Sequence, residues 1–150
     1  MLKDAANEAM RDWVMNLAMM HFLIRSCFGT HPFLTIICDY QKAISHEIKA
    51  QMKEAIEKLP DVVVPCIGGS SNAIGSFYRF IPDISVHLMG VEAGGKGIDS
   101  ECHSATLAGD KPGVLHKVRT YILQDPAAQI VEMHSVSARL DYSVIGLEHS

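Results

Sequence analysis

Residues Val62 to Phe80, which read VVVPCIGGSSNAIGSFYRF, constrain the fold more than any other stretch. The apolar run from Val62 to Ile67 predicts a strand buried on both faces, as in a parallel sheet. A glycine- and serine-rich loop follows, then a short helix over residues 72–80 that Pro82 ends. A second apolar run predicts a strand over residues 86–91. Strand, loop, helix and strand make a βαβ crossover, so the sequence predicts an α/β fold.

The loop between the first strand and the helix reads GGSSN, residues 68–72. Ligands of open α/β sheets lie beyond the carboxyl ends of the strands. A loop with few side chains exposes backbone N–H groups, and the following helix adds about half a positive charge at its N-terminus. Ser70, Ser71 and Asn72 add side-chain donors. The loop therefore suits an anion such as phosphate, although a plain strand-to-helix turn would also explain it.

Helical spacing predicts two longer helices before this unit. Apolar residues recur every three or four positions over residues 4–26, and from Trp13 onward the other faces are apolar too. A helix of this kind is buried on several sides, which in so short a chain implies a partner surface. Gly29 and Pro32 break the chain. A second helix is predicted over residues 39–58, with Asp39 as its N-cap and Pro60 after its end. Short strands are predicted near residues 114–116 and 121–124.

Composition excludes several classes of protein. The 150 residues carry a formal net charge of -4, which argues against nucleic acid or an anionic membrane as the main partner. The four cysteines form no C-x-x-C pair, which favours reduced thiols in the cytoplasm. No signal-peptide pattern is present, and the most apolar run, residues 14–24, is too short to span a bilayer. A single domain without a membrane segment is the simplest prediction.

Several longer motifs extend the pattern over nearly the whole chain and keep a fixed order. These runs are LKDAANEAMRDWV, GTHPFLTIICDYQ, LPDVVVPCIGGSSNAIG, GVEAGGKGI, KPGVLH, YILQD and SARLDYSVIGLEHS. Together they resemble the beta subunit of tryptophan synthase, a fold-type-II enzyme family that uses pyridoxal 5′-phosphate. The resemblance implies an open, mostly parallel sheet with flanking helices, forming one incomplete domain. Residues of about 1–38 resemble the communication region that faces the alpha subunit, and residues 39–150 the part that binds the cofactor phosphate.

The resemblance also implies roles for individual residues. The cofactor phosphate would lie in the loop formed by Gly68, Gly69, Ser70, Ser71 and Asn72, in which Ser70 replaces a family glycine. Asp141 matches the aspartate that contacts the substrate hydroxyl. The backbone carbonyls of Gly68, Tyr142 and Val144 match those that hold a monovalent cation, Na⁺ or K⁺. Leu115 and His116 match residues that line the indole tunnel.

Simpler interpretations of these residues stay open. Asp141 could be a surface carboxylate, and His116 a loop histidine whose nitrogens are satisfied locally. The run Glu101 to His103 has neither the spacing nor the partners of a metal site. Lys96, between glycines, does not match the family's catalytic lysine. The chain also departs from the family where special backbone residues occur: Pro65 removes a donor from the strand, and other substitutions are Thr30, Leu34, Ser70, Lys117, Arg139, Ser143 and Leu147.

The sequence supports two interpretations of function. In the first, the chain is a segment of a pyridoxal-phosphate-dependent lyase that joins indole to L-serine to give L-tryptophan and water. Its partners would be an alpha subunit and a second beta subunit, in the cytoplasm or, in a plant, the plastid. The family's covalent lysine would lie before Met1, so the chain alone is predicted to be inactive. In the second, the chain is a non-catalytic remnant or interaction module that retains the phosphate-binding loop.

Overall fold

The computed structural model describes residues 2–24, 26–27, 29, 31–100, 102–109, 111–116, 118–137, 140, 142 and 145–146. Within them the helices are α1 (Leu2–Met15), α2 (Phe33–Gln41), α3 (Ala43–Ile56), α4 (Ser71–Phe77), α5 (Thr106–Gly109) and the 3₁₀ turns η1 (Tyr78–Phe80) and η2 (Ile98–Ser100). The strands are β1 (Val62–Val63), β2 (His87–Leu88), β3 (Lys111–Leu115) and β4 (Val118–Ile122). This mixture of helices and small sheets confirms the predicted α/β class.

The predicted crossover is present as β1, α4 with η1, and β2. Strands β1 and β2 pair in parallel, with Val62 opposite His87 and Val63 opposite Leu88. A bridge between Cys66 and Val91 continues the pairing up to the loop. Pro65 accepts a 3.0 Å hydrogen bond from the N–H of Val91 but, as a proline, donates none. Among the described residues, the parallel sheet has two strands, and the sheet of β3 and β4 is antiparallel.

Burial along β1 corrects one prediction. Val63, Pro65 and Ile67 are buried, whereas Val62, Val64 and Cys66 are exposed. The inner face packs on α4 and η1 in a cluster that contains Ala73, Phe77, Phe80, Val86 and Ile145. The strand is therefore buried on one face and not on both, because no described element covers the outer face. Apolar side chains of the neighbouring strand, Leu88, Met89 and Val91, are exposed as well.

Helix α1 is shorter than the predicted helix over residues 4–26. It ends at Met15, and residues 16–19 form a turn in which the N–H groups of Met19 and Met20 both donate to the carbonyl of Asn16. The Asn16 side chain donates to the carbonyl of Asp12 at 3.1 Å. Asparagine competes in this way with the helical ladder, which explains why the helix stops inside an apolar run. Residues 20–24 continue without regular structure.

The second predicted helix begins earlier than expected. Helix α2 starts at Phe33, directly after Pro32, and α3 follows at Ala43 with Lys42 still in helical conformation. Asp39 lies inside α2, so its assignment as an N-cap is wrong. Proline is compatible with the start of a helix because the first N–H groups have no helical partner. Helix α3 ends at Ile56, where Glu57 adopts a left-handed conformation with φ 59°.

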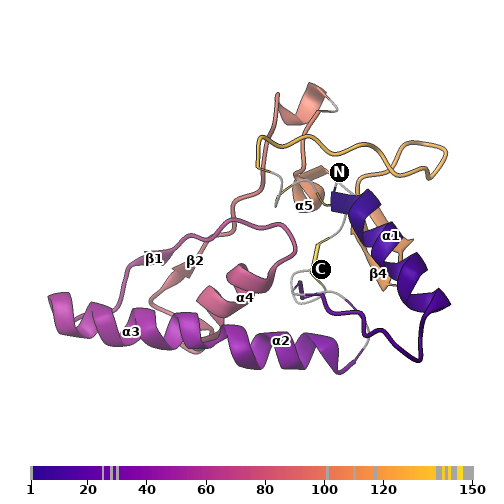
Figure 1. Cartoon of the computed structure of the whole chain (residues 1–150). Coiled ribbons are helices and arrows are strands. Elements are labelled where there is room, and N and C mark those ends of the chain that lie inside the picture. Colours follow the sequence, from indigo (N-terminus) through magenta and orange to yellow (C-terminus); the bar gives the residue numbers. More distant parts are fainter. Residues whose placement is uncertain are drawn as a thin grey trace.

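The helices α2 and α3 run end to end along one side of the molecule, and α4 lies between them and the parallel strands (Figure 1). On the other side, α1 lies next to β4, where Ala6 joins a cluster that contains Val118, Ile122 and Tyr142. A third small cluster joins Cys27, Cys38 and Ile74, from the segment before α2, from α2 and from α4. These contacts bring the loop after β1 close to residues from both ends of the chain.

Candidate functional site

A cavity of about 770 Å³ opens where the loop after β1 meets α1 and the segment that follows it. Its volume lies within the range of roughly 300–1,000 Å³ found for small-molecule sites. All five predicted loop residues line it. The other lining residues are Ala6, Ala9, Phe22, Leu23, Ile24, Ser26, Gln41, Cys66, Leu140 and Tyr142. The cavity therefore joins the predicted phosphate loop to residues that are distant in sequence.

Ser70 adopts a left-handed conformation, which a glycine would take more easily than a serine. Its φ is 66°, and its carbonyl accepts the N–H of Ile74 at 2.9 Å, which starts α4. The side chain is buried. Its hydroxyl donates to the carbonyl of Gly68 at 3.3 Å and accepts the N–H of Gly146 at 2.9 Å. The hydroxyl of Ser70 thus holds the loop to the C-terminal segment.

Gly69 lies against the segment between α1 and α2. Its carbonyl accepts the N–H of Cys27 at 2.9 Å. A Cβ atom on Gly69 would overlap the hydroxyl oxygen of Ser26. A glycine fits here because a Cβ would meet the side chain of Ser26, and not because of its φ angle. The close approach brings Ser26 into the wall of the cavity.

Ser71 and Asn72 form the first residues of α4 and face the same cavity. The Asn72 side-chain amide reaches back to the end of the strand region and donates to the carbonyl of Cys66 at 3.1 Å. It also lies 3.4 Å from the Cys66 sulfur. The side chains of Ser70 and Asn72 therefore both bond backbone carbonyls that precede them, at Gly68 and Cys66, and so stabilise the conformation of the loop.

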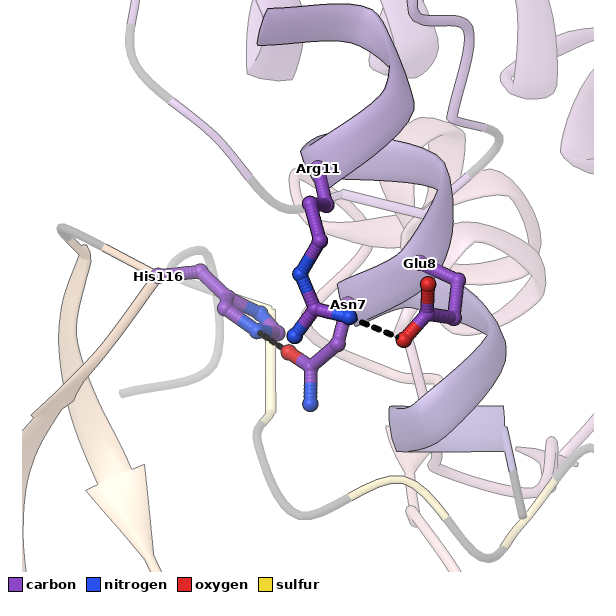
Figure 2. Close-up of polar contacts among 4 residues, drawn as sticks. All are labelled: Asn7, Glu8, Arg11 and His116. Carbon is purple, nitrogen blue, oxygen red and sulfur yellow. Dashed lines mark hydrogen bonds and ion pairs between the residues drawn. The ribbon is translucent and has the colours of Figure 1, made fainter. Parts of the chain in front are cut away.

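Tyr142 lines the cavity, and His116, which is not among the lining residues, contacts Tyr142. His116 Nδ1 is 2.8 Å from the hydroxyl oxygen of Tyr142, and His116 Nε2 is 2.7 Å from Oδ1 of Asn7. Figure 2 shows the Asn7 amide of α1 pointing toward the His116 ring. Burial, together with the nearby Lys3 ammonium, lowers the pKa of His116 below 6.5. Burial raises the pKa of Tyr142 to about 12.

The structure brings some of the predicted site residues together and leaves others outside its description. Gly68 and Tyr142, two of the proposed cation ligands, line the same cavity. Leu115 packs in the cluster that contains Tyr142, next to His116. Asp141, the predicted substrate contact, and Val144, the third cation ligand, lie outside the described residues. Leu115 and His116 are not among the residues that line the cavity, and the roles of all these residues stay predictions.

Several cavity residues were not predicted. Residues 22–24 were assigned to a helix, but they run without regular structure along the cavity wall. Ser26 and Gln41 carry no motif that would have singled them out. Asn7 lies 109 positions from its partner His116, so no spacing rule connects them. The neighbours of Asn7 at helical spacing include Lys3, Asp4 and Arg11, so no apolar pattern singled it out either.

Other candidate sites receive no support from the described residues. No group of three or more histidine, cysteine, aspartate or glutamate side chains is arranged to hold a metal ion within the described ranges. His103 is buried, and its Nδ1 accepts the N–H of Ala105 at 3.1 Å, which gives it a local structural role. No helix in the part of the chain that the structure describes is both long and apolar enough to cross a membrane.

Comparison with known proteins identifies a strong similarity. The chain is 50% identical over 149 residues to the tryptophan synthase beta chain of Nitrosomonas europaea, a match that covers 99% of this chain and 38% of the relative. It is 51% identical over 149 residues to that of Pseudomonas syringae pv. tomato, covering 99% of this chain and 36% of the relative. The chain thus spans between 36% and 38% of the length of these relatives. No protein-family model matches.

Proposed function

We propose that this chain, which is homologous to a segment of the tryptophan synthase beta chain, supplies the part of such an enzyme that binds the cofactor phosphate. The observation that carries the proposal is the loop of residues 68–72, which lines a cavity of about 770 Å³ at the start of α4. In the complete enzyme the reaction would join indole to L-serine, giving L-tryptophan and water. Residues of about 1–38 would form the communication region, and residues 39–150 the cofactor-phosphate part.

The residues present suit a phosphate group. Gly68 and Gly69 offer backbone without side chains, and the loop enters a helix whose first turn carries Ser71 and Asn72. N–H groups at a helix start favour an anion. Ser70 would contribute through its backbone, since its hydroxyl is already bonded to Gly68 and Gly146. When bound, pyridoxal phosphate would supply an electron sink that stabilises negative charge on the amino-acid substrate.

The remaining roles are inferred from the homology. Asp141 would contact the serine hydroxyl, and Leu115 and His116 would line the path of indole. The carbonyls of Gly68, Tyr142 and Val144 would hold a monovalent cation. An alpha subunit and a second beta subunit would be the partners, in the cytoplasm or a plastid. Because the family's covalent lysine has no match in these residues, the chain alone is expected to make no tryptophan.

The second candidate function is a non-catalytic interaction module that retains the anion-binding loop. It is favoured by the exposed apolar outer face of β1 and β2, which a partner would have to cover. Both candidates predict binding of phosphate. They differ in the role of that binding, because only the first predicts that the chain completes an active enzyme.

Binding is tested by adding inorganic phosphate or pyridoxal phosphate and following the backbone amide resonances. The amides of residues 68–72 should shift first. Ser71→Asp places a carboxylate in the first turn of α4. The positive end of a helix accepts this charge, but a bound phosphate would be repelled by it, so phosphate affinity should fall about tenfold or more. Gln51→Glu on the exposed side of α3 adds the same charge and is the matched control. Shifts centred elsewhere, or equal losses in both variants, would contradict the assignment.

Catalysis is tested by complementation. The chain is mixed with a polypeptide that carries the rest of a tryptophan synthase beta chain, and tryptophan is measured with indole, L-serine and pyridoxal phosphate present. Restored synthesis supports the enzyme segment. Phosphate binding without restored synthesis supports the interaction module. Synthesis by the chain alone, with one stoichiometrically labelled lysine such as Lys96 after borohydride reduction, would overturn the expected inactivity.

A further inference from the structure

One peptide group of the C-terminal segment lies between two buried hydroxyls. The carbonyl of Ile145 accepts a hydrogen bond from Oγ1 of Thr120 at 2.9 Å, and the N–H of Gly146 donates to Oγ of Ser70 at 2.9 Å. This carbonyl and this N–H belong to the same planar peptide unit, so the orientation of one fixes the orientation of the other. The unit therefore joins β4 to the loop after β1.

The hydrogen bonds form a chain that runs in one direction. When the Thr120 hydroxyl donates to the carbonyl, it polarises the peptide unit, and the N–H at the other end becomes a stronger donor. The Ser70 hydroxyl accepts that N–H and donates its own proton to the carbonyl of Gly68 at 3.3 Å. The chain thus begins at Thr120 and ends at the first residue of the loop of residues 68–72.

Packing leaves the peptide unit little freedom. The side chain of Ile145 is 1% exposed and lies in the core cluster that packs on α4. A Cβ atom on Gly146 would lie 2.6 Å from the Cβ of Ser70, so a residue without a side chain fits against the loop. Thr120 and Ser70 are buried as well, at 3% and 1% exposed. Water therefore has little access to the groups that form these bonds.

We propose that Thr120 is a positioning residue for the loop of residues 68–72, acting through the peptide unit of residues 145 and 146 on the Ser70 hydroxyl. Thr120 is not among the residues that line the cavity, so it would not touch a ligand there. Without its hydroxyl the peptide unit could turn, and the Gly68 carbonyl would lose its orientation. Phosphate would then bind the loop less tightly. This effect on phosphate rests on the proposed function; the positioning of the loop does not.

The first experiment needs no ligand. In the unsubstituted chain the amide of Gly146 should exchange slowly with deuterium, and rapid exchange would overturn the bond to Ser70. Thr120→Val keeps the branched shape of the side chain but removes the hydroxyl. It should shift the Gly146 amide proton upfield, as expected for a weaker hydrogen bond, and move the carbonyl carbon resonance of Gly68. Thr120→Ser keeps a hydroxyl and should restore both resonances.

Two comparisons separate positioning from a general loss of stability. Thr106→Val removes the hydroxyl of a threonine that is also 3% exposed, at the start of α5, and should leave the Gly146 and Gly68 resonances in place. In a Ser70→Gly background, Thr120→Val should no longer move the Gly68 resonance, because the hydroxyl that joins the two is missing. Equal shifts in both backgrounds, or no shift with Ser70 present, would refute positioning through Ser70.

The second experiment measures the binding of inorganic phosphate. Thr120→Val should weaken it about threefold to tenfold, as expected for the loss of one hydrogen bond, and Thr120→Ser should bind as tightly as the original chain. Thr106→Val is again the control and should not change the affinity. Unchanged affinity in Thr120→Val would refute its effect on the binding conformation of the loop. If the unsubstituted chain binds no phosphate, the proposed function fails, and the Gly68 resonance alone decides the positioning.

Discussion

The hydroxyl oxygen of Ser70 accepts a 2.9 Å hydrogen bond from the backbone N–H of Gly146, which joins the loop after β1 to the C-terminal segment. Both residues occupy special positions. Ser70 holds a left-handed backbone with φ 66°. A Cβ atom on Gly146 would lie 2.6 Å from the Cβ of Ser70 and 2.9 Å from the carbonyl oxygen of Cys27. The strained backbone of Ser70 is thus accompanied by a buried hydrogen bond between its side chain and Gly146.

The first prediction separates the strain at Ser70 from its hydrogen bond. Ser70→Ala should lose about 1–3 kcal/mol of stability because the buried N–H of Gly146 loses its acceptor. Ser70→Gly loses the same bond but relieves the left-handed backbone, which is worth roughly 1 kcal/mol. The glycine variant should therefore be the more stable of the two. Urea unfolding of both variants checks the order, and a more stable alanine variant would show that the conformation carries no strain.

Ser70→Gly would relieve strain and crowding in the loop, which by itself should raise phosphate affinity. The same substitution removes the hydrogen bond to Gly146, which opposes that gain. The loop would gain a residue that tolerates its conformation and lose the contact that holds it. From the sequence, the resemblance marked Ser70 as a replacement of a family glycine, and the structure gives it a φ of 66°. It could not reveal the partner of the hydroxyl, because Gly146 lies 76 positions away.

Gly146 provides the second prediction. Gly146→Ala must push the Cβ of Ser70 or the backbone at Cys27, because both neighbours would be closer than ordinary contact. Overpacking of this kind usually costs about 1–3 kcal/mol. Gly94→Ala is the matched control, since a Cβ there meets nothing within 4 Å and the residue has no positive φ. Thermal or urea unfolding should therefore show a loss for Gly146→Ala that Gly94→Ala does not share.

Local patterns predicted the unit that carries the site. The apolar run, the glycine-rich loop and the short helix became β1, the loop of residues 68–72 and α4, because each depends on nearby residues and on strong turn signals. The end of α1 at Met15 was missed because the apolar run continues to Ile24. Periodicity describes how the apolar residues are spaced. It does not detect a side chain such as Asn16, which hydrogen-bonds to a backbone carbonyl of the last helical turn.

Sequence patterns could not predict the contacts between segments that are distant in the chain. The run of three valines that begins with β1, Val62 to Val64, is the pattern of a strand covered on both faces. The structure shows that Val62 and Val64 are exposed. The tunnel role of His116 stays a prediction from the resemblance, and its two hydrogen-bond partners come from α1 and from the C-terminal segment. Neither fact can be read from local propensity, because each depends on which elements lie side by side.

The pH dependence of stability provides the third prediction. The pKa of His116 is below 6.5 in the folded chain, so between this value and 6.5 the unfolded state binds more protons than the folded state. The contribution of His116 to stability is complete above pH 6.5 and is lost as the pH falls toward the folded pKa. His116→Gln removes this titration. Urea unfolding across this pH range should show a weaker decline for the variant, and identical slopes would contradict the lowered pKa.

The fourth prediction concerns the exposed apolar side chains after the middle of α1. Met19 is 89% exposed and Leu23 80% exposed, near Val14, Met15 and Leu17, which are also exposed. Apolar side chains gathered in this way mark association surfaces. The chain should therefore associate with itself when no partner is present, and its average mass in sedimentation equilibrium should rise with concentration.

Met19→Lys tests this surface, because a charge there must be desolvated on association while the exposed position tolerates lysine in the monomer. Val136→Lys is the matched control: Val136 is fully exposed, and it lies far along the chain from residues 14–23. Association should weaken in Met19→Lys and stay unchanged in Val136→Lys. If both variants associate as strongly as the original chain while Val64→Lys on the outer face of the parallel sheet does not, the sheet is the contact surface. A monomer at every concentration would mean that neither apolar surface drives association.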